Sequence, residues 1–253
     1  MTKLRLEGLG KVFGEGDNAV AALEDITIDV REGEFAVVVG PSGCGKSTLL
    51  NIVAGLEPET TGRAVINGRR IQGPGADRGM VFQSYTLFPW LSVRKNIEFG
   101  LRIKGLPTAQ RARIARRYLK LVALEEFENA LPKALSGGMQ QRTAIARVLA
   151  NSPDMLLMDE PFGALDAQTR LQLQDLLLDV WREESATVLF ITHDIDEAIL
   201  LADTIHIMSR RPGRIIKSIA VDIPRPRDHR TSLQPEFTAI KKDIMETLWE
   251  ELS

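Results

Sequence analysis

A glycine-rich stretch between two apolar runs is the feature that most constrains how this chain can fold. Residues 40–48 read GPSGCGKST, which fits the pattern G-x-x-x-x-G-K-[ST]. Residues 35–39 (FAVVV) before it are typical of a buried strand, and residues 49–54 (LLNIVA) after it are typical of a helix. This order brings free backbone N–H groups and the positive end of a helix dipole to one point, so we expect a phosphate to bind there.

The residue types in this stretch indicate how a nucleotide phosphate is held. Glycines let the backbone approach an anion closely. Lys46 adds a positive charge for the outer phosphates, and the Ser47 hydroxyl is a ligand for Mg²⁺. The residues expected to contact the nucleotide are Gly40, Pro41, Ser42, Gly43, Cys44, Gly45, Lys46, Ser47 and Thr48.

The composition of the chain excludes several classes of protein. The 253 residues carry a net charge of -2, which argues against nucleic acid as a partner because proteins that bind it usually present a basic face. Cys44 is the sole cysteine, which rules out an internal disulfide framework and fits a reducing compartment. No apolar run approaches the ~20 residues that span a bilayer, and no signal peptide is expected. Any role at a membrane should therefore come through a partner.

Two adjacent carboxylates close a second apolar run. Residues 154–160 read DMLLMDE, a pattern typical of a strand buried on both faces of a parallel sheet. Two acids at the end of such a strand are costly unless they hold a cation or take part in chemistry. We therefore predict that Asp159 is a Mg²⁺ ligand and that Glu160 is the general base for an attacking water molecule.

Two further apolar runs also end in polar residues. Residues 187–192 (TVLFIT) precede His193, and residues 79–82 (GMVF) precede Gln83. Alone, Gln83 would be a solvated strand end, and a single histidine is more often structural than catalytic. Because the carboxyl ends of parallel strands meet at one edge of a sheet, their convergence favours a functional interpretation.

For three other segments, the residues alone are compatible with two interpretations each. Ser136, Gly137 and Gly138 open a helical run and either bind an anion or simply cap the helix. Phe13 is a core aromatic, which we favour, or a flat face for a nucleotide base. The apolar loop at 84–91 either folds inward or presents a contact surface.

The sequence also predicts several elements outside these motifs. A helix expected at 108–128 carries several arginines, which we interpret as a solvated face rather than a nucleic-acid surface. His206 lies in an alternating strand and is expected to be structural. Residues 224–230 (PRPRDHR) indicate a basic, semi-extended linker. A tail helix at 235–252 should dock on another surface, because one of its faces carries Phe237, Ile240, Ile244 and Leu248.

Together, these motifs resemble those of the ATP-binding subunit of an ABC transporter. The resemblance covers residues 4–221 and implies an α/β fold: a P-loop NTPase (RecA-like) core with an N-terminal antiparallel β subdomain and an inserted α-helical subdomain. The motifs that carry it are GPSGCGKST, Gln83, LSGGMQQR (135–142), LLMDEP (156–161), GALD (163–166) and His193.

The resemblance also implies boundaries within the chain. The core with its β subdomain is expected at 1–85, the helical subdomain with the LSGG signature at 86–153, the rest of the core at 154–222, and a linker with a C-terminal helix at 223–253.

Subunits of this family pair head to tail, so the resemblance implies that ATP and Mg²⁺ bind between two copies of the chain. Ser136, Gly137 and Gly138 of one copy would contact the γ-phosphate on the P-loop of the other, and Asp166 would link the two sites. Phe13 would stack on adenine, where the family commonly has tyrosine. The residues implied in catalysis are Lys46, Gln83, Glu160 and His193. The implied Mg²⁺ ligands are Ser47, Gln83 and Asp159.

Three stretches look like those of the nitrate/sulfonate/taurine import group: 71–79 (IQGPGADRG), 88–90 (FPW) and 211–214 (RPGR). The implied function is ATP hydrolysis that energises import of a small anion. The implied partners are permease subunits and, indirectly, a substrate-binding protein, with this chain peripheral at the cytoplasmic face of the plasma (inner) membrane.

In this group, residues 85–90 would line the groove that receives a coupling helix of the permease. The alternative function is that of a soluble ABC-type ATPase in DNA repair or translation. That alternative predicts a long coiled-coil insertion or two cassettes in one chain, and the sequence has neither.

Overall fold

The computed structural model describes residues 1–251, and two β-sheets form their centre. The larger sheet has the order β10-β9-β3-β8-β7-β6, and all its neighbouring strands are parallel except β9 and β10. Every residue of β3 and β8 is buried, which explains their apolar sequences. The predicted parallel core is confirmed. Its strands are β3 (Phe35–Val39), β6 (Arg78–Val81), β7 (Met155–Asp159), β8 (Thr187–Thr192), β9 (Thr204–Met208) and β10 (Ile215–Ala220).

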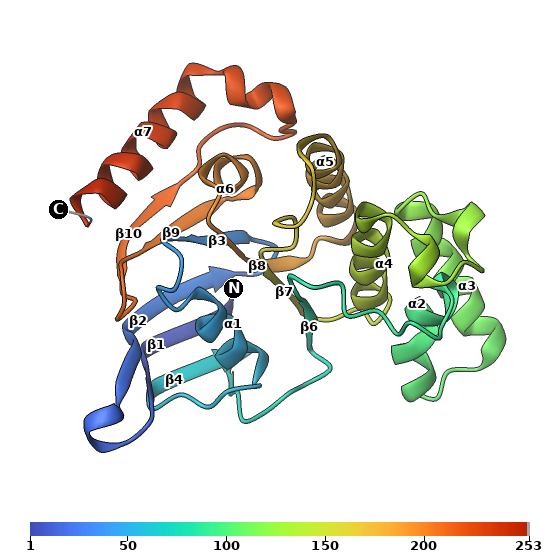
Figure 1. Cartoon of the computed structure of the whole chain (residues 1–253), viewed down its shortest axis with the longest axis horizontal. Coiled ribbons are helices and arrows are strands. Elements are labelled where there is room, and N and C mark those ends of the chain that lie inside the picture. Colours follow the sequence, from blue (N-terminus) through green and yellow to red (C-terminus); the bar gives the residue numbers. More distant parts are fainter. Residues whose placement is uncertain (252–253) are drawn as a thin grey trace.

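A second, antiparallel sheet has the order β2-β1-β4-β5. Its first two strands form a long hairpin with a 3-10 helix (Gly16–Asn18) at the tip. Helix α1 (Lys46–Ala54) lies close to both sheets (Figure 1). Its side chains pack with those of both sheets in one core, where Leu49 and Leu50 are completely buried. The strands are β1 (Thr2–Phe13), β2 (Val20–Arg31), β4 (Thr61–Ile66) and β5 (Arg69–Arg70).

Three helices form a layer at one end of the larger sheet, on the right in Figure 1: α2 (Val93–Ile103), α3 (Thr108–Leu121) and α4 (Gly137–Leu149). Helix α2 is an addition to the predicted elements. Its sequence signal is an N-cap serine followed by apolar residues at intervals of four. These residues are Ser92, then Val93, Ile97 and Leu101.

Helix α3 is shorter than the predicted range of 108–128. It ends at Leu121, and Ala123 then adopts a left-handed φ of 52°. Two 3-10 helices follow, Glu125–Phe127 and Pro132–Ala134. The turn buries Val122 and Leu124 in the core, so tertiary packing overrides the helical periodicity here.

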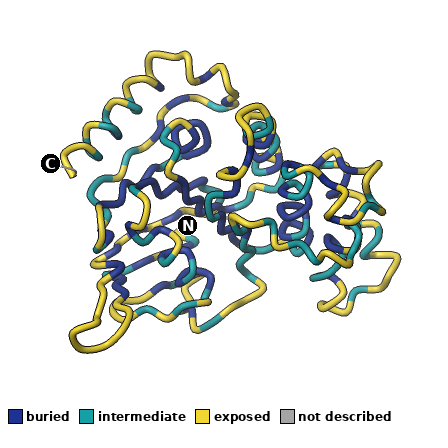
Figure 2. Tube along the Cα trace, in the orientation of Figure 1, coloured by how far each residue is buried: buried dark blue, intermediate teal, exposed yellow. Residues whose placement is uncertain are grey.

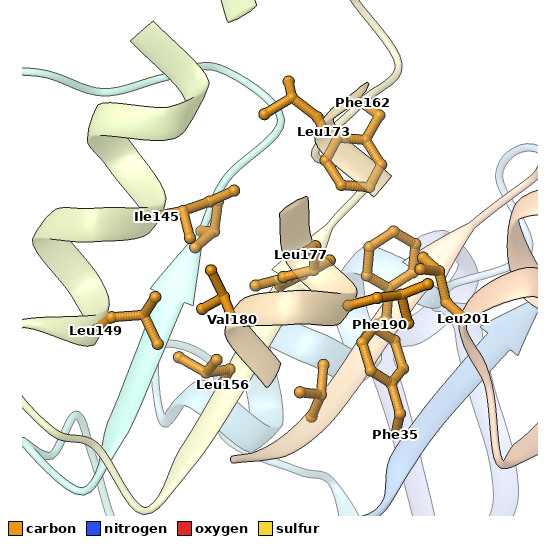
Figure 3. Packing of buried hydrophobic residues seen from close by; sticks show 14 of the residues in the cluster. Phe35, Ile145, Leu149, Leu156, Phe162, Leu173, Leu177, Val180, Phe190 and Leu201 are labelled. Carbon is orange, nitrogen blue, oxygen red and sulfur yellow. The ribbon is translucent and has the colours of Figure 1, made fainter. Parts of the chain in front are cut away.

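Helix α5 (Ala167–Glu184) joins the helical layer to the larger sheet. Figure 3 shows Leu177 and Val180 of α5 between Ile145 and Leu149 of α4 on one side and Phe190 of β8 on the other. All belong to one buried hydrophobic cluster. Figure 2 shows buried residues concentrated in the middle of the molecule and exposed residues around its outside. The helical layer is therefore packed onto the core rather than tethered to it. Among residues 1–251, no helix combines the length and apolar character needed to cross a bilayer.

The segment predicted as a linker is instead packed onto the core. Arg227 is only 5% exposed. Its guanidinium donates to carbonyl groups at the end of α6 (Ile195–Leu201) and after β10, which is why a basic side chain is buried here. The accepting carbonyls belong to Ile199, Leu200, Ala202, Val221 and Ile223.

The chain then forms a 3-10 helix (His229–Leu233) and helix α7 (Pro235–Glu250). Helix α7 docks as predicted, with Phe237 and Ile244 buried. Leu252, at the end of the predicted tail helix, lies outside the described residues.

His206 is structural, as predicted. Its side chain is 5% exposed, and Nδ1 lies 2.8 Å from the Ser218 hydroxyl of the neighbouring strand. Burial lowers the pKa of His206 to about 4, which keeps the ring neutral at physiological pH.

Replacing Arg227 with alanine should destabilise the protein strongly, because several buried carbonyls lose their donors. We expect the free energy of unfolding in urea to fall by about 3 kcal/mol. Arg230→Ala, in the same basic segment but exposed, is the matched control and should change it by less than about 0.5 kcal/mol. Equal effects of the two substitutions would contradict the packed arrangement of this segment.

Candidate active site

The strand register of the larger sheet brings the expected site residues to one edge. Val39 of β3 pairs with Thr192 of β8, and Asp159 of β7 pairs with Ile191. The residues that follow these strand ends are therefore neighbours at the carboxyl edge. The backbone N–H of Glu160 also donates to the carbonyl of Ile191 over 2.9 Å.

The P-loop is packed tightly against the strands behind it. Gly45 has a φ of 110°, and a Cβ there would lie 2.8 Å from the carbonyl oxygen of Ala22. A Cβ at Gly40 would lie 2.8 Å from the carbonyl oxygen of Met208. Only glycine fits at these two positions, so the loop keeps a fixed curve in front of α1.

Lys46 is the buried cation of the site. Its side chain is 5% exposed, and Nζ donates to the carbonyls of Gly40 (2.9 Å) and Pro41 (3.1 Å). The P-loop backbone thus surrounds the ammonium group and holds it at the loop. The thiol of Cys44 is buried behind it, and burial raises the pKa of Cys44, so this cysteine is held as a neutral thiol.

Ser47 and Asp159 meet although they lie far apart in the sequence. The Ser47 hydroxyl donates to Asp159 Oδ1 over 3.0 Å. Burial raises the pKa of Asp159, and the bond from Ser47 opposes this shift. A hydroxyl and a carboxylate at this distance are hard oxygen ligands that suit Mg²⁺. Within residues 1–251 no cluster of three or more His, Cys, Asp or Glu side chains could hold a metal alone, so phosphate and water oxygens would have to complete such a site.

Glu160 links the lysine to the histidine. Its carboxylate lies 4.0 Å from Lys46 Nζ and 2.9 Å from His193 Nδ1. A carboxylate only accepts, so this second contact requires a hydrogen on Nδ1. Glu160 has a φ of 43°, an uncommon backbone conformation for a residue with a side chain, which turns it away from the line of β7.

Gln83 lies near this group but is exposed. A Cβ added to Gly163 would lie 3.6 Å from Gln83 Nε2 and 3.9 Å from Glu160 Oε2. The structure therefore brings together, around one sheet edge, all the site residues expected within one copy except Phe13. These are the P-loop residues with Gln83, Asp159, Glu160 and His193.

The residues expected to act in the second copy form another group. Ser136 caps α4 and accepts from Met139 N, and Asp166 caps α5 and accepts from Thr169 N. The bond from Thr169 lowers the pKa of Asp166. A Cβ at Gly138 would lie 2.5 Å from Thr169 Cγ2, so the two helix starts are in contact. In Figure 1, α4 lies well to the side of α1.

The position of Phe13 shows that the preferred interpretation, a core aromatic, is wrong. It stands at the end of β1, is 41% exposed, and has Lys11 Nζ at 4.9 Å from its ring centroid. The hairpin that carries it also supports the P-loop through Ala22, so an exposed aromatic face lies on the element behind the loop.

The apolar loop at 84–91 is partly folded inward and partly exposed, so each of the two interpretations holds for some of its residues. Phe88 and Tyr85 are partly buried, whereas Trp90 is 72% exposed. Phe88 lines a groove of about 460 Å³ between the larger sheet and α2. Arg147 of α4 also lines the groove and donates to the Thr86 carbonyl over 2.9 Å. No sequence pattern singled out Arg147.

A second set of contacts, absent from the sequence-based predictions, joins α5 to α6. Arg170 lies 3.4 Å from Asp194, which caps α6 directly after His193. Gln174 donates to the buried carboxyl of Glu197 over 3.0 Å. Burial raises the pKa of Glu197 to about 7. These contacts fix the helix that begins at Asp166 against the helix that follows His193.

The fold and this site define a P-loop ATPase. The profile of the ABC transporter family matches residues 23–163. A Methanocaldococcus jannaschii protein, called an uncharacterized ABC transporter ATP-binding protein, is 53% identical over 99% of this chain and 92% of its own length. The chain therefore belongs to the ABC transporter family, as an ATP-binding domain.

Other relatives have more specific names. The nitrate import ATP-binding protein NrtD of Synechocystis is 45% identical over 97% of this chain and 94% of its own length. The taurine import ATP-binding protein TauB of Roseobacter denitrificans is 46% identical over 99% and 95%. Among solved structures, the dimeric post-hydrolysis state of the ATP-binding cassette MJ0796, bound to ADP and Pi, has a TM-score of 0.76 and 34% identity, covering 87% of this chain and 100% of its own.

Glu197 should make the stability of the protein depend on pH. Its pKa rises from 4.5 in the unfolded chain to about 7 in the fold, so folding favours the protonated form. The contribution of this group is therefore fully present below pH 4.5 and is lost as the pH rises through 7.

Glu197→Gln removes the titrating group and keeps an acceptor for Gln174. We expect the free energy of unfolding of this variant, relative to the unsubstituted protein, to rise by up to about 3 kcal/mol between pH 5 and pH 8. Urea titrations at several pH values measure this difference. A difference that stays constant from pH 5 to pH 8 would contradict the raised pKa of Glu197.

Proposed function

We propose that this chain is the ATP-hydrolysing subunit of an ABC importer for a small anion of the nitrate, sulfonate or taurine type. The observation that carries the ATPase chemistry is the meeting of Lys46, the Ser47–Asp159 pair and the Glu160–His193 pair at one sheet edge. The substrate class is supported by the relatives named as nitrate and taurine import proteins, which match nearly the whole chain.

Magnesium is the cofactor that these residues fit. Ser47, Asp159 and Gln83 would hold Mg²⁺, either directly or through water. Bound there, the ion would supply positive charge to the phosphate oxygens. Lys46 and the backbone N–H groups of the P-loop would bind the same phosphates from the other side.

Glu160 is the proposed general base. A water oxygen forms a bond to the γ-phosphorus as the bond to the β-phosphate oxygen breaks, and ADP leaves. The Glu160 carboxylate accepts the proton of this water. His193 holds that carboxylate through the 2.9 Å contact, so it would fix both the position of the base and its hydrogen-bonding direction.

The site would be completed by a second copy of the chain. Ser136, Gly137 and Gly138 stand at the start of α4, where N–H groups and the helix dipole favour an anion. We propose that they bind the γ-phosphate held by the partner's P-loop and that Asp166 contacts the opposite site. The dimeric form of the similar cassette supports this pairing.

Permease subunits are the second class of partner. The groove beside Phe88 and Arg147, next to the exposed Trp90, is lined by apolar side chains and by basic ones, a combination that suits an amphipathic helix. Docking of a permease helix there would place the chain peripherally at the cytoplasmic face of the plasma (inner) membrane. A substrate-binding protein would then contact the permease rather than this chain.

Glu160→Gln should abolish turnover while ATP binding is retained, because the amide keeps the size of the side chain but cannot accept the proton. We expect the steady-state ATPase rate to fall at least 100-fold, while the affinity for ATP changes less than about threefold. Ordinary multiple-turnover hydrolysis by this variant would rule out Glu160 as the base.

Trp90→Ala should weaken assembly with the permease, since the largest exposed side chain beside the groove is removed. We expect at least tenfold less permease to co-purify from membranes of a strain that expresses the whole transporter. Leu233→Ala is the matched control, because Leu233 is also exposed (83%) but lies just before α7. Unchanged co-purification with Trp90→Ala would contradict the proposed docking site.

A further inference from the structure

Helix α7 is held firmly on the core, so the direction of its side chains is fixed. Phe237 and Ile244 are buried on one face. Two ion pairs flank this face: Lys217 of β10 lies 2.6 Å from Asp243, and Lys241 lies 2.7 Å from Asp196 of α6. Figure 1 shows α7 outside α6 and β10, at the edge of the molecule.

The last two turns of α7 extend to the P-loop. Met245, Leu248 and Trp249 form one wall of a cavity of about 330 Å³. The first P-loop residues, 40–42, and His193 line the same cavity. Trp249 is 57% exposed, although it stands beside the phosphate site. No part of the proposed function within a single copy uses this apolar wall.

We propose that Met245, Leu248, Trp249 and Glu251, with Arg210 on the facing loop, form a contact surface for a second copy of this chain in the ATP-bound pair. This inference rests on the proposed head-to-tail pairing. In that pairing, the P-loop and His193 form the half-site that the second copy covers. A surface that shares a cavity with those residues is continuous with the covered face.

The composition of this surface fits a contact between identical copies. In a two-fold pair every contact occurs twice, with the roles of the two copies exchanged, and a surface with charges of both signs can form ion pairs in both contacts. Arg210 and Glu251 line the same cavity and supply both signs. A large aromatic side chain beside them is the residue type that most often dominates the energy of an interface.

The first experiment measures ATP-dependent dimerisation of the full-length Glu160→Gln protein by sedimentation velocity. We expect the added substitution Trp249→Ala to raise the dimer dissociation constant at least tenfold. Leu233→Ala, exposed on the segment before α7, should change it less than twofold. Equal dissociation constants for all three proteins would overturn the inference while leaving the proposed pairing intact. A parent protein that stays monomeric with ATP at every concentration would overturn both.

The second experiment observes Trp249 directly in the Glu160→Gln protein labelled with 5-fluorotryptophan. Three tryptophans give ¹⁹F signals, and the signal lost in Trp249→Phe identifies the one at position 249. We expect ATP to shift this signal only at protein concentrations where dimer forms. A shift that is already complete in monomeric protein would mean that α7 responds to nucleotide within its own subunit, and no shift in the dimer would mean that the surface stays in solvent. Either result would overturn the inference.

Discussion

The parallel pairing of β3, β8 and β7 is the constraint on which the rest of the molecule depends. Each strand ends at the same level, so the P-loop, Glu160 and His193 follow at one edge. A shift of one strand by one residue would move its polar end along the edge by about 3.3 Å and turn each of its side chains to the opposite face of the sheet. The register that positions the site residues is therefore the same register that packs the core.

The site concentrates polar groups where burial makes them costly. Lys46 is satisfied by P-loop carbonyls, Asp159 by the Ser47 hydroxyl, and Glu160 by His193. Each of these partners also positions a group expected to meet phosphate, Mg²⁺ or water. The contacts that stabilise the charges and the contacts that prepare the site are the same, which is the arrangement expected of a preorganised catalytic centre.

The sequence predicts the parts of the fold that local chemistry determines. The buried strands and the P-loop follow from apolar runs and glycine spacing, so their places could be predicted. The early end of α3 could not, because burial of Val122 and Leu124 decides it. Arg227 looked like part of a basic linker, and its partners are carbonyl groups that no sequence pattern reveals. The roles of individual site residues remain predictions.

In the proposed pairing, one chain holds only half of an ATPase site. The most direct measurement is the ATPase turnover per chain as a function of protein concentration, with the mass of the species followed by sedimentation. Below the dissociation constant of the ATP-bound pair, turnover per chain should rise in proportion to concentration and then level off as dimer forms. Constant turnover per chain in a sample that remains monomeric throughout would contradict the proposed pairing.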